Sequence, residues 1–300
     1  MNSVAGIDLW QWRSQAYQQA IAANISTAEV DWLLQSVSDL DRLSLRLDSF
    51  KHQAAIPLKL PFVDLVSLWQ QRIQARVPVQ YLIGRAAWRQ FWLQVSPAVL
   101  IPRPETEGLI DLVVAARNRA TLDQEATGAE HWADLGTGSG AIALGLADAL
   151  PLATIHAVDR SQAALAIAQT NARNYGLSDR IHFYQGDWLA PLAHLKGQLR
   201  GLVSNPPYIP SQMVLELQPE VTRHEPHLAL DGGIDGLDCI RHLVNVAPVY
   251  LQPGGIWLVE MMAGQADAVT QLLRSQGNYT GIEIHSDLAG IDRFALAYRR

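Results

Sequence analysis

Apolar residues along this chain follow two different periods, which divide it into parts of different expected structure. From residue 7 to about residue 76 they recur three or four positions apart, the spacing typical of amphipathic helices. Ser26 and Glu29 have the spacing of a capping box at the start of one helix, and prolines interrupt the pattern several times. The sequence therefore predicts a small all-helical domain at residues 1–80, a kind of domain that can bind a partner.

The period changes to two between residues 88 and 101, where apolar side chains alternate with polar ones. This alternation predicts a β-hairpin with Pro97 near its turn, and we assign residues 81–104 to a hairpin linker between two domains. Pro104 follows, and proline is favoured at the first position of a helix. We therefore expect the next helix to begin at Pro104, with acidic residues in its first turn.

Short apolar runs alternate with helical segments from residue 105 to residue 300. After a polar loop at 118–130, strands are expected at 131–135, 154–159, 181–184, up to 203, at 256–260 and at 294–298. Strands that alternate with helices predict a doubly wound, Rossmann-like α/β sheet. In such sheets ligands bind beyond the carboxyl ends of the strands, so candidate site residues are those that follow strands.

The amino-acid composition indicates how large a core the chain can bury and in which compartment we expect the protein. The chain has 300 residues, 49% of them hydrophobic, which is enough for a large core and two domains. Its net charge is -6, and its 23 basic residues are scattered among 29 acidic ones, which argues against an extended nucleic-acid interface. Cys239 is the single cysteine and cannot form an internal disulfide. Since no signal-peptide pattern and no apolar run of about 18 residues is visible, we expect a cytoplasmic protein without membrane spans.

A glycine-rich turn lies between the strand expected at 131–135 and the helix expected at 141–150. It reads Asp-Leu-Gly-Thr-Gly-Ser-Gly over residues 134–140. Glycines at alternate positions let a ligand approach bare backbone beside a helix N-terminus. The spacing differs from the dinucleotide fingerprint, and no phosphate-loop Gly-Lys-Ser/Thr follows. The turn therefore indicates a ligand site of another kind.

Asp159 ends the next expected strand. An acidic residue at this place can hold the hydroxyls of a ribose, as it does in nucleotide-binding units. The alternative is that Asp159 caps the helix that starts near Ser161. We favour the ribose role because Asp159 lies at the carboxyl end of a strand.

The segment Asn205-Pro206-Pro207-Tyr208 follows the apolar run 201–203. Two prolines make a stiff extended turn whose carbonyls stay free as acceptors. The Asn205 amide can grip a flat NH2-bearing group by its edge, and the Tyr208 ring can pack against the face of that group. The alternative is an ordinary proline-rich turn after a strand, with no role in ligand binding. Beside the glycine turn, the segment indicates a methyl-donor site facing a planar amide or amine.

These motifs give the chain a close resemblance to a known family. It resembles the class I S-adenosylmethionine-dependent methyltransferases, and more closely the HemK-type protein-(glutamine-N5) methyltransferases that modify peptide chain release factors. The resemblance covers nearly the whole chain. Its motifs lie at residues 81–84, 101–107, 134–140, 186–188, 205–208, 224–226 and 230–233. One departure lies after Glu260, where Met261, Met262 and Ala263 precede the expected glycine, Gly264.

The resemblance implies a substrate, a cofactor and a role for each motif. The helical domain at 1–80 would help to dock a class 1 release factor, whose Gly-Gly-Gln loop would enter the catalytic crevice of the methyltransferase domain at 105–300. S-adenosylmethionine would be the methyl donor and S-adenosylhomocysteine the product. The implied cofactor residues are Gly136, Thr137, Gly138, Ser139 and Gly140 at the methionine part, Asp159 at the ribose, Trp188 at the adenine, and in addition Asp187 and Asn205. The implied substrate residues are Asn205, Pro206, Pro207 and Tyr208, with Asn205, Pro206 and Tyr208 as catalytic groups.

The chemistry of an amide suggests how this site would act. An amide nitrogen is a weak nucleophile, because its lone pair is delocalised into the carbonyl group. Our hypothesis is that the Asn205 side-chain oxygen and the Pro206 carbonyl accept both amide hydrogens, which aligns the nitrogen with the methyl group.

Two other functions and several residues stay open. An Asn-Pro-Pro-Tyr site can also hold the amino group of a flipped adenine in DNA or RNA, and a methyltransferase scaffold can bind without catalysis. A ribosomal-protein glutamine is a third possible target. Arg85 and Arg103 can meet the partner or the cofactor, or pair with nearby acids. His224 and His227 lack the spacing of metal ligands, so we expect a structural loop and no metal.

Overall fold

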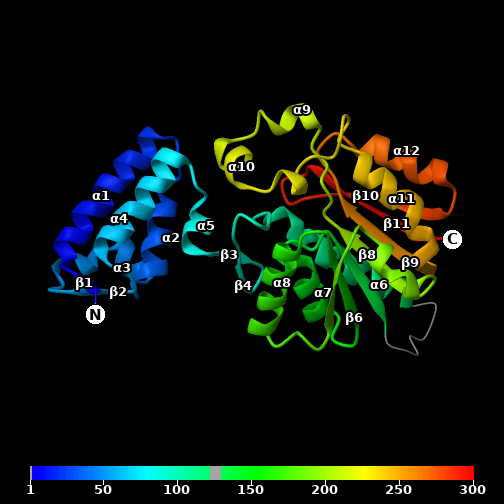
Figure 1. Cartoon of the computed structure of the whole chain (residues 1–300), viewed down its shortest axis with the longest axis horizontal. Helices are drawn as coiled ribbons and strands as arrows, with labels where there is room; N and C mark the ends of the chain where they lie inside the picture. The colour runs from blue at the N-terminus through cyan, green and yellow to red at the C-terminus, as the bar shows by residue number, and fades with distance from the viewer. Residues whose placement is uncertain (1, 122–129) are drawn as a thin grey trace. The chain divides into compact units, whose positions relative to one another are not determined.

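The computed structural model of the chain describes residues 2–121 and 130–300. The chain forms two compact units, which we describe separately (Figure 1). The helical unit comprises the residues up to Gly84 together with the short segment Pro219–His224. The sheet unit comprises Arg85–Gln218, without 122–129, and Glu225–Arg300. A short segment that is flanked on both sides by the sequence of the sheet unit therefore packs within the helical unit.

The helical unit contains short helices around an apolar core. Its helices are α1 (Gly6–Ala22), α2 (Ala28–Val37), α3 (Arg42–Arg46), α4 (Phe62–Gln70), α5 (Val79–Ile83) and α10 (Pro219–His224), with single turns at η1 (Ser49–His52) and η2 (Gln71–Ala75). Phe50 and Trp69 are the largest fully buried side chains of this core. The prediction of an all-helical domain missed one feature, since β1 (Asn2–Val4) and β2 (Ile56–Leu58) form a short antiparallel pair.

The predicted capping box at Ser26 and Glu29 is wrong. Thr27 occupies the N-cap of α2 and makes no side-chain cap hydrogen bond, while the Ser26 hydroxyl accepts from the Ala28 N–H at 3.3 Å. Glu29 is bound elsewhere, because its carboxylate pairs with the buried guanidinium of Arg72 at 2.5 Å. A second carboxylate, that of Glu220 in α10, binds Arg72 at 2.8 Å. This pairing attracts Glu29 more strongly than the helix end does, since a buried charge needs a partner.

The β-hairpin forms at a different register from the predicted one. Its strands are β3 (Arg85–Trp88) and β4 (Phe91–Gln94), and the turn lies at Arg89 and Gln90 instead of near Pro97. Arg89 has a φ of 49°, a conformation that glycine or asparagine usually supplies in such turns. The sequence offered neither residue there, so the turn was misplaced. Residues 95–101 continue without a strand.

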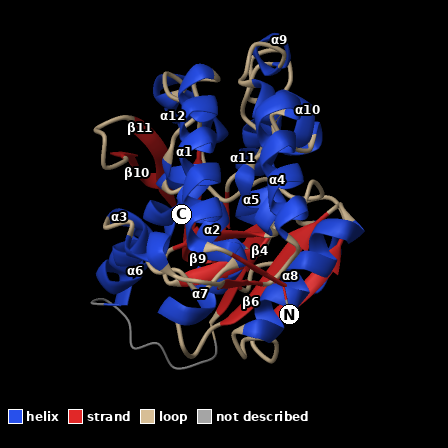
Figure 2. Ribbon diagram, turned by 90° about the vertical axis from the view of Figure 1, so that its left-hand side faces the viewer, coloured by secondary structure: helices blue, strands red, loops and turns tan. Residues whose placement is uncertain are grey.

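The sheet unit confirms the predicted doubly wound fold. Within the described residues, seven strands form one sheet in the order β10-β11-β9-β8-β5-β6-β7. Their bounds are β5 (His131–Leu135), β6 (Thr154–Asp159), β7 (Ile181–Gln185), β8 (Leu199–Ser204), β9 (Leu251–Glu260), β10 (Tyr279–Ser286) and β11 (Asp292–Arg299). Strands β5 to β9 run parallel, and β11 lies antiparallel between β9 and β10. Figure 2 shows β10 and β11 together at one edge of the sheet.

Helices cover both faces of this sheet (Figure 1). One apolar cluster joins the sheet to α6 (Gly108–Thr121), α7 (Ala141–Ala149) and α8 (Gln162–Asn174). The other joins it to η4 (Ala190–Leu195), α11 (Asp238–Tyr250) and α12 (Ala266–Gln276). The short elements are η3 (Glu105–Glu107), α9 (Ser211–Val214) and η5 (His227–Ala229). Because the central strands are buried on both faces, their sequences read as continuous apolar runs.

Two predicted boundaries around α6 are wrong. Pro104 precedes the single turn η3, and the helix itself begins at Gly108 rather than at Pro104. The helix then continues to Thr121, into the segment 118–130 that was expected to be a polar loop. Residues 122–129 of that loop lie outside the described residues. Among the described residues, no helix has the length and apolar character needed to cross a membrane.

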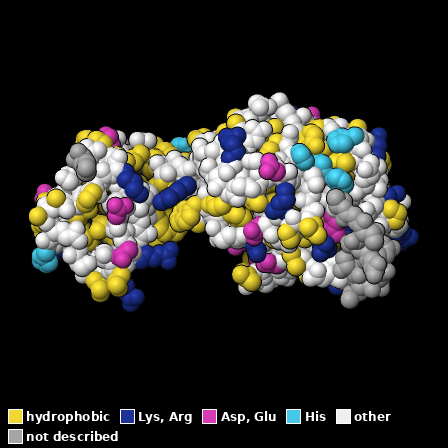
Figure 3. Space-filling view, turned by 90° about the horizontal axis from the view of Figure 1, so that it is seen from below, with side chains coloured by type: hydrophobic (Ala, Val, Ile, Leu, Met, Phe, Trp, Pro, Cys, Tyr) yellow, Lys and Arg dark blue, Asp and Glu magenta, His cyan; other side chains and the backbone are white. Residues whose placement is uncertain are grey.

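Histidine side chains gather on one face of the sheet unit (Figure 3). His131 Nδ1 lies 3.0 Å from His156 Nε2, and His156 Nδ1 lies 3.1 Å from the Tyr184 hydroxyl. The rings of His182 and His194 pack against His156 as well. Burial, together with the three neighbouring histidines, lowers the pKa of His156 to about 4. His156 is therefore neutral in the folded protein near pH 7.

Candidate active site

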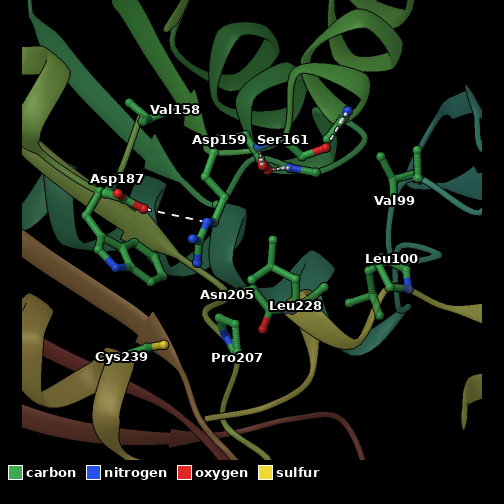
Figure 4. A pocket seen from close by; sticks show the side chains of 18 of the residues that line it. Val99, Leu100, Val158, Asp159, Ser161, Asp187, Asn205, Pro207, Leu228 and Cys239 are labelled. Atoms are coloured by element: carbon green, nitrogen blue, oxygen red, sulfur yellow. Dashed lines mark hydrogen bonds and ion pairs between the residues drawn. The ribbon is translucent and has the colours of Figure 1, made fainter. Parts of the chain in front are cut away.

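A cavity of about 260 Å³ opens at the carboxyl ends of the parallel strands (Figure 4). The predicted site residues that line it are Gly136, Gly138, Asp159, Asp187, Trp188, Asn205 and Pro207. The other predicted site residues are not part of this lining, namely Thr137, Ser139, Gly140, Pro206 and Tyr208. Strands β5, β6 and β8 end at the same level, since Leu135 pairs with both Val158 and Ser204. The sheet therefore brings the motifs at 136–140, 159 and 205–208 to one place, as the sequence predicted.

The glycine turn presents backbone to the cavity. Gly136 and Gly138 have φ values of 75° and 54°, a region that L side chains rarely adopt. Gly140 also has a positive φ, and a Cβ there would lie 3.1 Å from Ala168 of α8. The first two glycines thus leave room for a ligand, whereas Gly140 allows close packing between the turn and α8.

Asp134, which the sequence analysis did not name as a site residue, is hydrogen-bonded to the glycine turn. Its Oδ2 accepts hydrogen bonds from the Thr137 hydroxyl at 2.5 Å and from the Ala143 N–H at 2.9 Å. The side chain is fully buried, and burial raises its pKa to about 7 despite these hydrogen bonds. Its Oδ1 has no partner among the described residues. Asp134 therefore connects the turn to the first turn of α7.

Asp159 ties the end of β6 to the glycine turn. Its Oδ2 accepts from the Gly138 N–H at 2.9 Å, and its Oδ1 accepts from the Ser161 N–H at 2.8 Å. Ser161 itself caps α8, because its hydroxyl accepts from the Ala164 N–H at 3.2 Å. Burial raises the pKa of Asp159 above its ordinary value. The alternative that Asp159 is the helix cap is thus wrong, and its oxygens face the cavity region between the two strand ends (Figure 4).

Trp188 forms a wall of the cavity in a strained conformation. Its φ is 49°, which is rare for a bulky residue and is most often kept at functional sites. The ring lies beside Gly136, where a Cβ would come within 3.8 Å of it. The neighbouring Asp187 is exposed and lies 3.6 Å from Arg160. The cavity therefore has an aromatic wall next to bare backbone.

Asn205 and Tyr208 are anchored by groups from distant parts of the chain. The Asn205 Nδ2 donates to the Thr106 hydroxyl at 3.2 Å. The Tyr208 hydroxyl donates to Glu260 Oε1 at 3.1 Å. Glu260 is only 1% exposed, and burial raises its pKa to about 7. Its Oε2 makes no hydrogen bond within the described residues. The Tyr208 hydroxyl is thus bound to a buried acid, and Tyr208 is not among the residues that line the cavity.

The residues whose roles the sequence left open are bound to neighbours. Arg103 donates to both oxygens of the buried Glu225, at 2.9 and 2.8 Å. Arg85 stacks over the ring of Trp92, with 4.7 Å between the guanidinium carbon and the ring centroid. His224 Nε2 contacts the Ala75 carbonyl within the helical unit at 2.7 Å. Across residues 2–121 and 130–300, no group of three or more His, Cys, Asp or Glu side chains has a geometry for metal binding.

Sequence reasoning missed Thr106, Asp134 and Glu260 as parts of the site. Asp134 and Glu260 are carboxyl groups in the last residues of parallel strands, at the edge where ligands bind in such sheets. That position was the available signal for both residues. Thr106 does not end a strand but lies in the single turn η3, and its available signal was its place in the motif at 101–107; its contact with Asn205, 99 residues away in sequence, gave none.

Comparison with known proteins identifies methyltransferases as similar to this chain. A family model described as methyltransferase small domain matches residues 120–224. A release factor glutamine methyltransferase of Synechocystis sp. is 52% identical over 98% of this chain and 97% of its own length. Another, of Thermosynechococcus vestitus, is 49% identical over 96% of each chain.

Solved structures show the same fold at much lower identity. The crystal structure of the hMettl16 catalytic domain in complex with the MAT2A 3′UTR hairpin 6 covers 79% of this chain and 80% of its own, with a TM-score of 0.54 and 15% identity. This likeness concerns the fold alone. The relatives, by contrast, match over almost their entire length. With a glycine turn, an acidic strand end and an Asn-Pro-Pro-Tyr segment around one cavity, this chain belongs to the family of release factor glutamine methyltransferases.

Proposed function

We propose that this protein transfers a methyl group from S-adenosylmethionine to the side-chain amide nitrogen of the glutamine in the Gly-Gly-Gln motif of class 1 release factors. The observation that carries the proposal is the position of Asn205, whose side chain lines the same cavity as Gly136, Gly138 and Asp159. A group that can hold a planar amide thus lies beside a group that can hold a nucleoside. The names of the near-full-length relatives support this substrate.

The cavity residues fit S-adenosylmethionine. Each oxygen of Asp159 accepts one backbone N–H and keeps a further lone pair, which leaves acceptors for ribose hydroxyls. Gly136 and Gly138 leave bare backbone where the methionine part would lie, and Trp188 supplies an apolar wall for the adenine. When bound, the cofactor supplies an electrophilic methyl group on a sulfonium.

The substrate glutamine would be held by the Asn-Pro-Pro-Tyr segment. Because Asn205 Nδ2 already donates to Thr106, its Oδ1 is the atom left to accept a hydrogen from the substrate amide. The Pro206 carbonyl would accept the second amide hydrogen. Two acceptors on one NH2 group fix its plane and stabilise positive charge that grows on the nitrogen.

Methyl transfer then needs no metal and no covalent enzyme intermediate. The substrate nitrogen, held by Asn205 and Pro206, would form a bond to the methyl carbon, and the electrons of the carbon–sulfur bond would remain on sulfur. The alkylated nitrogen is positively charged until it releases one amide hydrogen as a proton to water. Asn205 and Pro206 contribute by position and by hydrogen bonding, since neither group is a strong base.

The sequence analysis assigned docking of the release factor to a domain at 1–80. We further propose that the whole helical unit, which also includes residues 219–224, has this role. Its surface carries large apolar side chains that are more than half exposed, namely Ile21, Leu43, Leu47 and Val63. The proposal requires that such side chains form a contiguous patch, which is the kind of exposed apolar surface that marks protein-binding sites. The hairpin β3–β4 would connect this docking unit to the methyltransferase domain.

Transfer of labelled methyl groups tests the substrate directly. The purified protein would be incubated with labelled S-adenosylmethionine and a class 1 release factor, and in parallel with the same factor carrying alanine in place of the Gly-Gly-Gln glutamine. Ribosomal protein and DNA serve as further acceptors. Label on the normal factor alone supports the proposal.

The other outcomes separate the alternatives. Label only on ribosomal protein or only on DNA would overturn the substrate and keep the methyltransferase chemistry. Cofactor binding without label on any acceptor would contradict the proposed reaction and favour a binding role.

A further inference from the structure

We propose that Glu260 and Thr106 are positioning residues that set the orientation of the Asn205 amide and so decide which of its atoms faces the substrate. This inference rests on the proposed function. Its structural basis is a set of contacts between three segments that are far apart in sequence. Glu260 ends β9, Thr106 lies in η3, and Asn205 follows β8.

The two end residues of the Asn-Pro-Pro-Tyr segment, Asn205 and Tyr208, both have hydrogen-bond partners at or next to Glu260. At one end, the Tyr208 hydroxyl donates directly to Glu260 Oε1 at 3.1 Å. At the other end, Asn205 Nδ2 donates to the Thr106 hydroxyl at 3.2 Å, and the Thr106 side chain in turn interacts with the Glu260 carboxyl group. Glu260 therefore binds the last residue of the segment directly and lies next to Thr106, the residue that binds the first.

The direction of these hydrogen bonds follows from the chemistry of the groups. Glu260 is ionised above its raised pKa of about 7, and because an ionised carboxylate can only accept, the hydroxyls beside it then donate to it. The Thr106 hydroxyl hydrogen is then directed to Glu260, and the Thr106 oxygen is left as an acceptor for Asn205 Nδ2. The Asn205 Oδ1 consequently faces away from Thr106 and is free for the substrate.

The surroundings of Glu260 are suited to this role. The side chain is 1% exposed, and Oε2 has no hydrogen bond within the described residues, which leaves this oxygen open to a hydrogen from a neighbouring hydroxyl. The charged groups that act on the carboxyl are Arg293 of β11 and Glu105 of η3, with Tyr208 beside it. Arg293 favours the ionised form, whereas Glu105 opposes it.

Replacement of Glu260 by a neutral amide should reverse the direction of the hydrogen bond between Thr106 and Asn205. In Glu260→Gln, one oxygen becomes an NH2 donor, so one of the two hydroxyls loses its acceptor. If Thr106 then donates toward Asn205, the amide turns and presents NH2 instead of oxygen to the substrate NH2. Two donors facing each other cannot form a hydrogen bond. The loss should appear in kcat and not in cofactor binding.

Four variants test the proposal: Thr106→Val, Thr106→Ser, Glu260→Gln and Tyr208→Phe. Turnover on release factor, affinity for S-adenosylmethionine and melting temperature are measured for each, with the wild-type protein in the same assay. We expect Thr106→Val and Glu260→Gln to lose about tenfold or more in kcat, because an oriented hydrogen bond is lost. Thr106→Ser keeps the hydroxyl and should retain most of the turnover. Cofactor affinity should stay within about threefold of wild type.

A second readout does not depend on turnover. The side-chain amide signal of Asn205 in a ¹H–¹⁵N spectrum, identified by its absence in Asn205→Ala, should exchange with water faster in Thr106→Val than in Thr106→Ser. Equal exchange and equal kcat in these two variants would overturn the positioning role. So would a parallel loss of cofactor affinity and kcat in Glu260→Gln, since that pattern indicates a general defect of the site.

The wild-type assay separates this inference from the proposed function. Absence of label on release factor with the wild-type protein would contradict the function, whatever the variants do. The exchange measurement would still report on the orientation of Asn205. If Thr106→Val does not fold, Glu260→Gln and Tyr208→Phe remain, and Tyr208→Phe should leave the Asn205 exchange unchanged because it removes the other hydrogen bond to Glu260.

Discussion

The Asp159 carboxylate accepts a hydrogen bond from the Gly138 N–H at 2.9 Å, which joins the end of one strand to the turn after its neighbour. The second oxygen accepts from the Ser161 N–H at 2.8 Å. The acid therefore shapes the glycine turn as well as offering acceptors to a ligand. Any change at Asp159 should affect both functions together.

Asp159→Asn should weaken binding of S-adenosylmethionine by about tenfold or more, since the loss of one charge-assisted hydrogen bond costs about 1.5 to 3 kcal/mol. The NH2 group of asparagine would face one of two backbone N–H donors and displace the turn. Isothermal titration calorimetry measures the affinity. Asp179→Asn, an exposed acid of the same unit, is the control. Equal affinities in the two variants would remove Asp159 from the cofactor site.

Asn205→Ala should lower turnover at least about a hundredfold, because loss of one preorganised polar partner costs about 2.7 to 4 kcal/mol. Cofactor affinity should change little, since the backbone of the glycine turn and Asp159 remain. Single-turnover methyl transfer and direct cofactor titration measure the two effects separately. Near-normal turnover in this variant would rule out the amide as a catalytic group.

The double variant Leu43→Glu and Leu47→Glu tests the docking surface. These side chains are 62% and 65% exposed, so the changes should leave the fold intact. We expect the KM for release factor to rise about tenfold and that for a short Gly-Gly-Gln peptide to stay the same, because only the intact factor reaches the helical unit. Leu288→Glu, at a fully exposed position of the sheet unit, is the control. A similar loss with both acceptors would contradict a docking role.

Gly201→Ala should destabilise the sheet unit by about 1 to 3 kcal/mol, the usual cost of overpacking. A Cβ at Gly201 would lie 2.1 Å from the ring of the buried Trp132, which cannot move without disturbing the core. Urea denaturation measures the change in the free energy of unfolding. Gly197→Asn is the matched control, because that glycine has open space around it and asparagine tolerates its φ of 71°. The same stability in both variants would show that the ring adapts.

The lowered pKa of His156 should make the folded protein less stable at acidic pH. Its pKa is about 4 in the folded protein, against about 6.5 for an unfolded histidine. Below pH 6.5 the unfolded chain therefore binds a proton that the folded chain does not, so the free energy of unfolding falls as the pH falls toward 4. His156→Gln should remove part of this fall, and His52→Gln, at an exposed position, should not. Identical pH profiles for His156→Gln and wild type would exclude the effect.

The sequence predicted the central sheet well because its strands are buried on both faces and therefore read as apolar runs. It predicted the meeting of Gly136, Asp159 and Asn205 because each follows such a strand. It misplaced the hairpin turn, since Arg89 adopts a left-handed conformation that its residue type does not signal. Local patterns carry no information on partners that only the folded chain brings together.

Glu260 shows the same limit at the site. Its partner Tyr208 is 52 residues away, and the interaction depends on the adjacent ends of β8 and β9. An acid at the end of an apolar strand could have been selected from the sequence. That its carboxyl group binds the Tyr208 hydroxyl of the Asn-Pro-Pro-Tyr segment required the structure.

The buried ion cluster of the helical unit has a consequence for engineering this enzyme. Arg72 is bound by Glu29 and by Glu220, and Glu220 lies 148 residues further along the chain. A chimera that exchanges only the N-terminal segment with that of a relative would separate Arg72 from a partner encoded in the other half of the gene. Hybrid enzymes with altered substrate choice should therefore be built by moving residues 2–84 and 219–224 as one cassette.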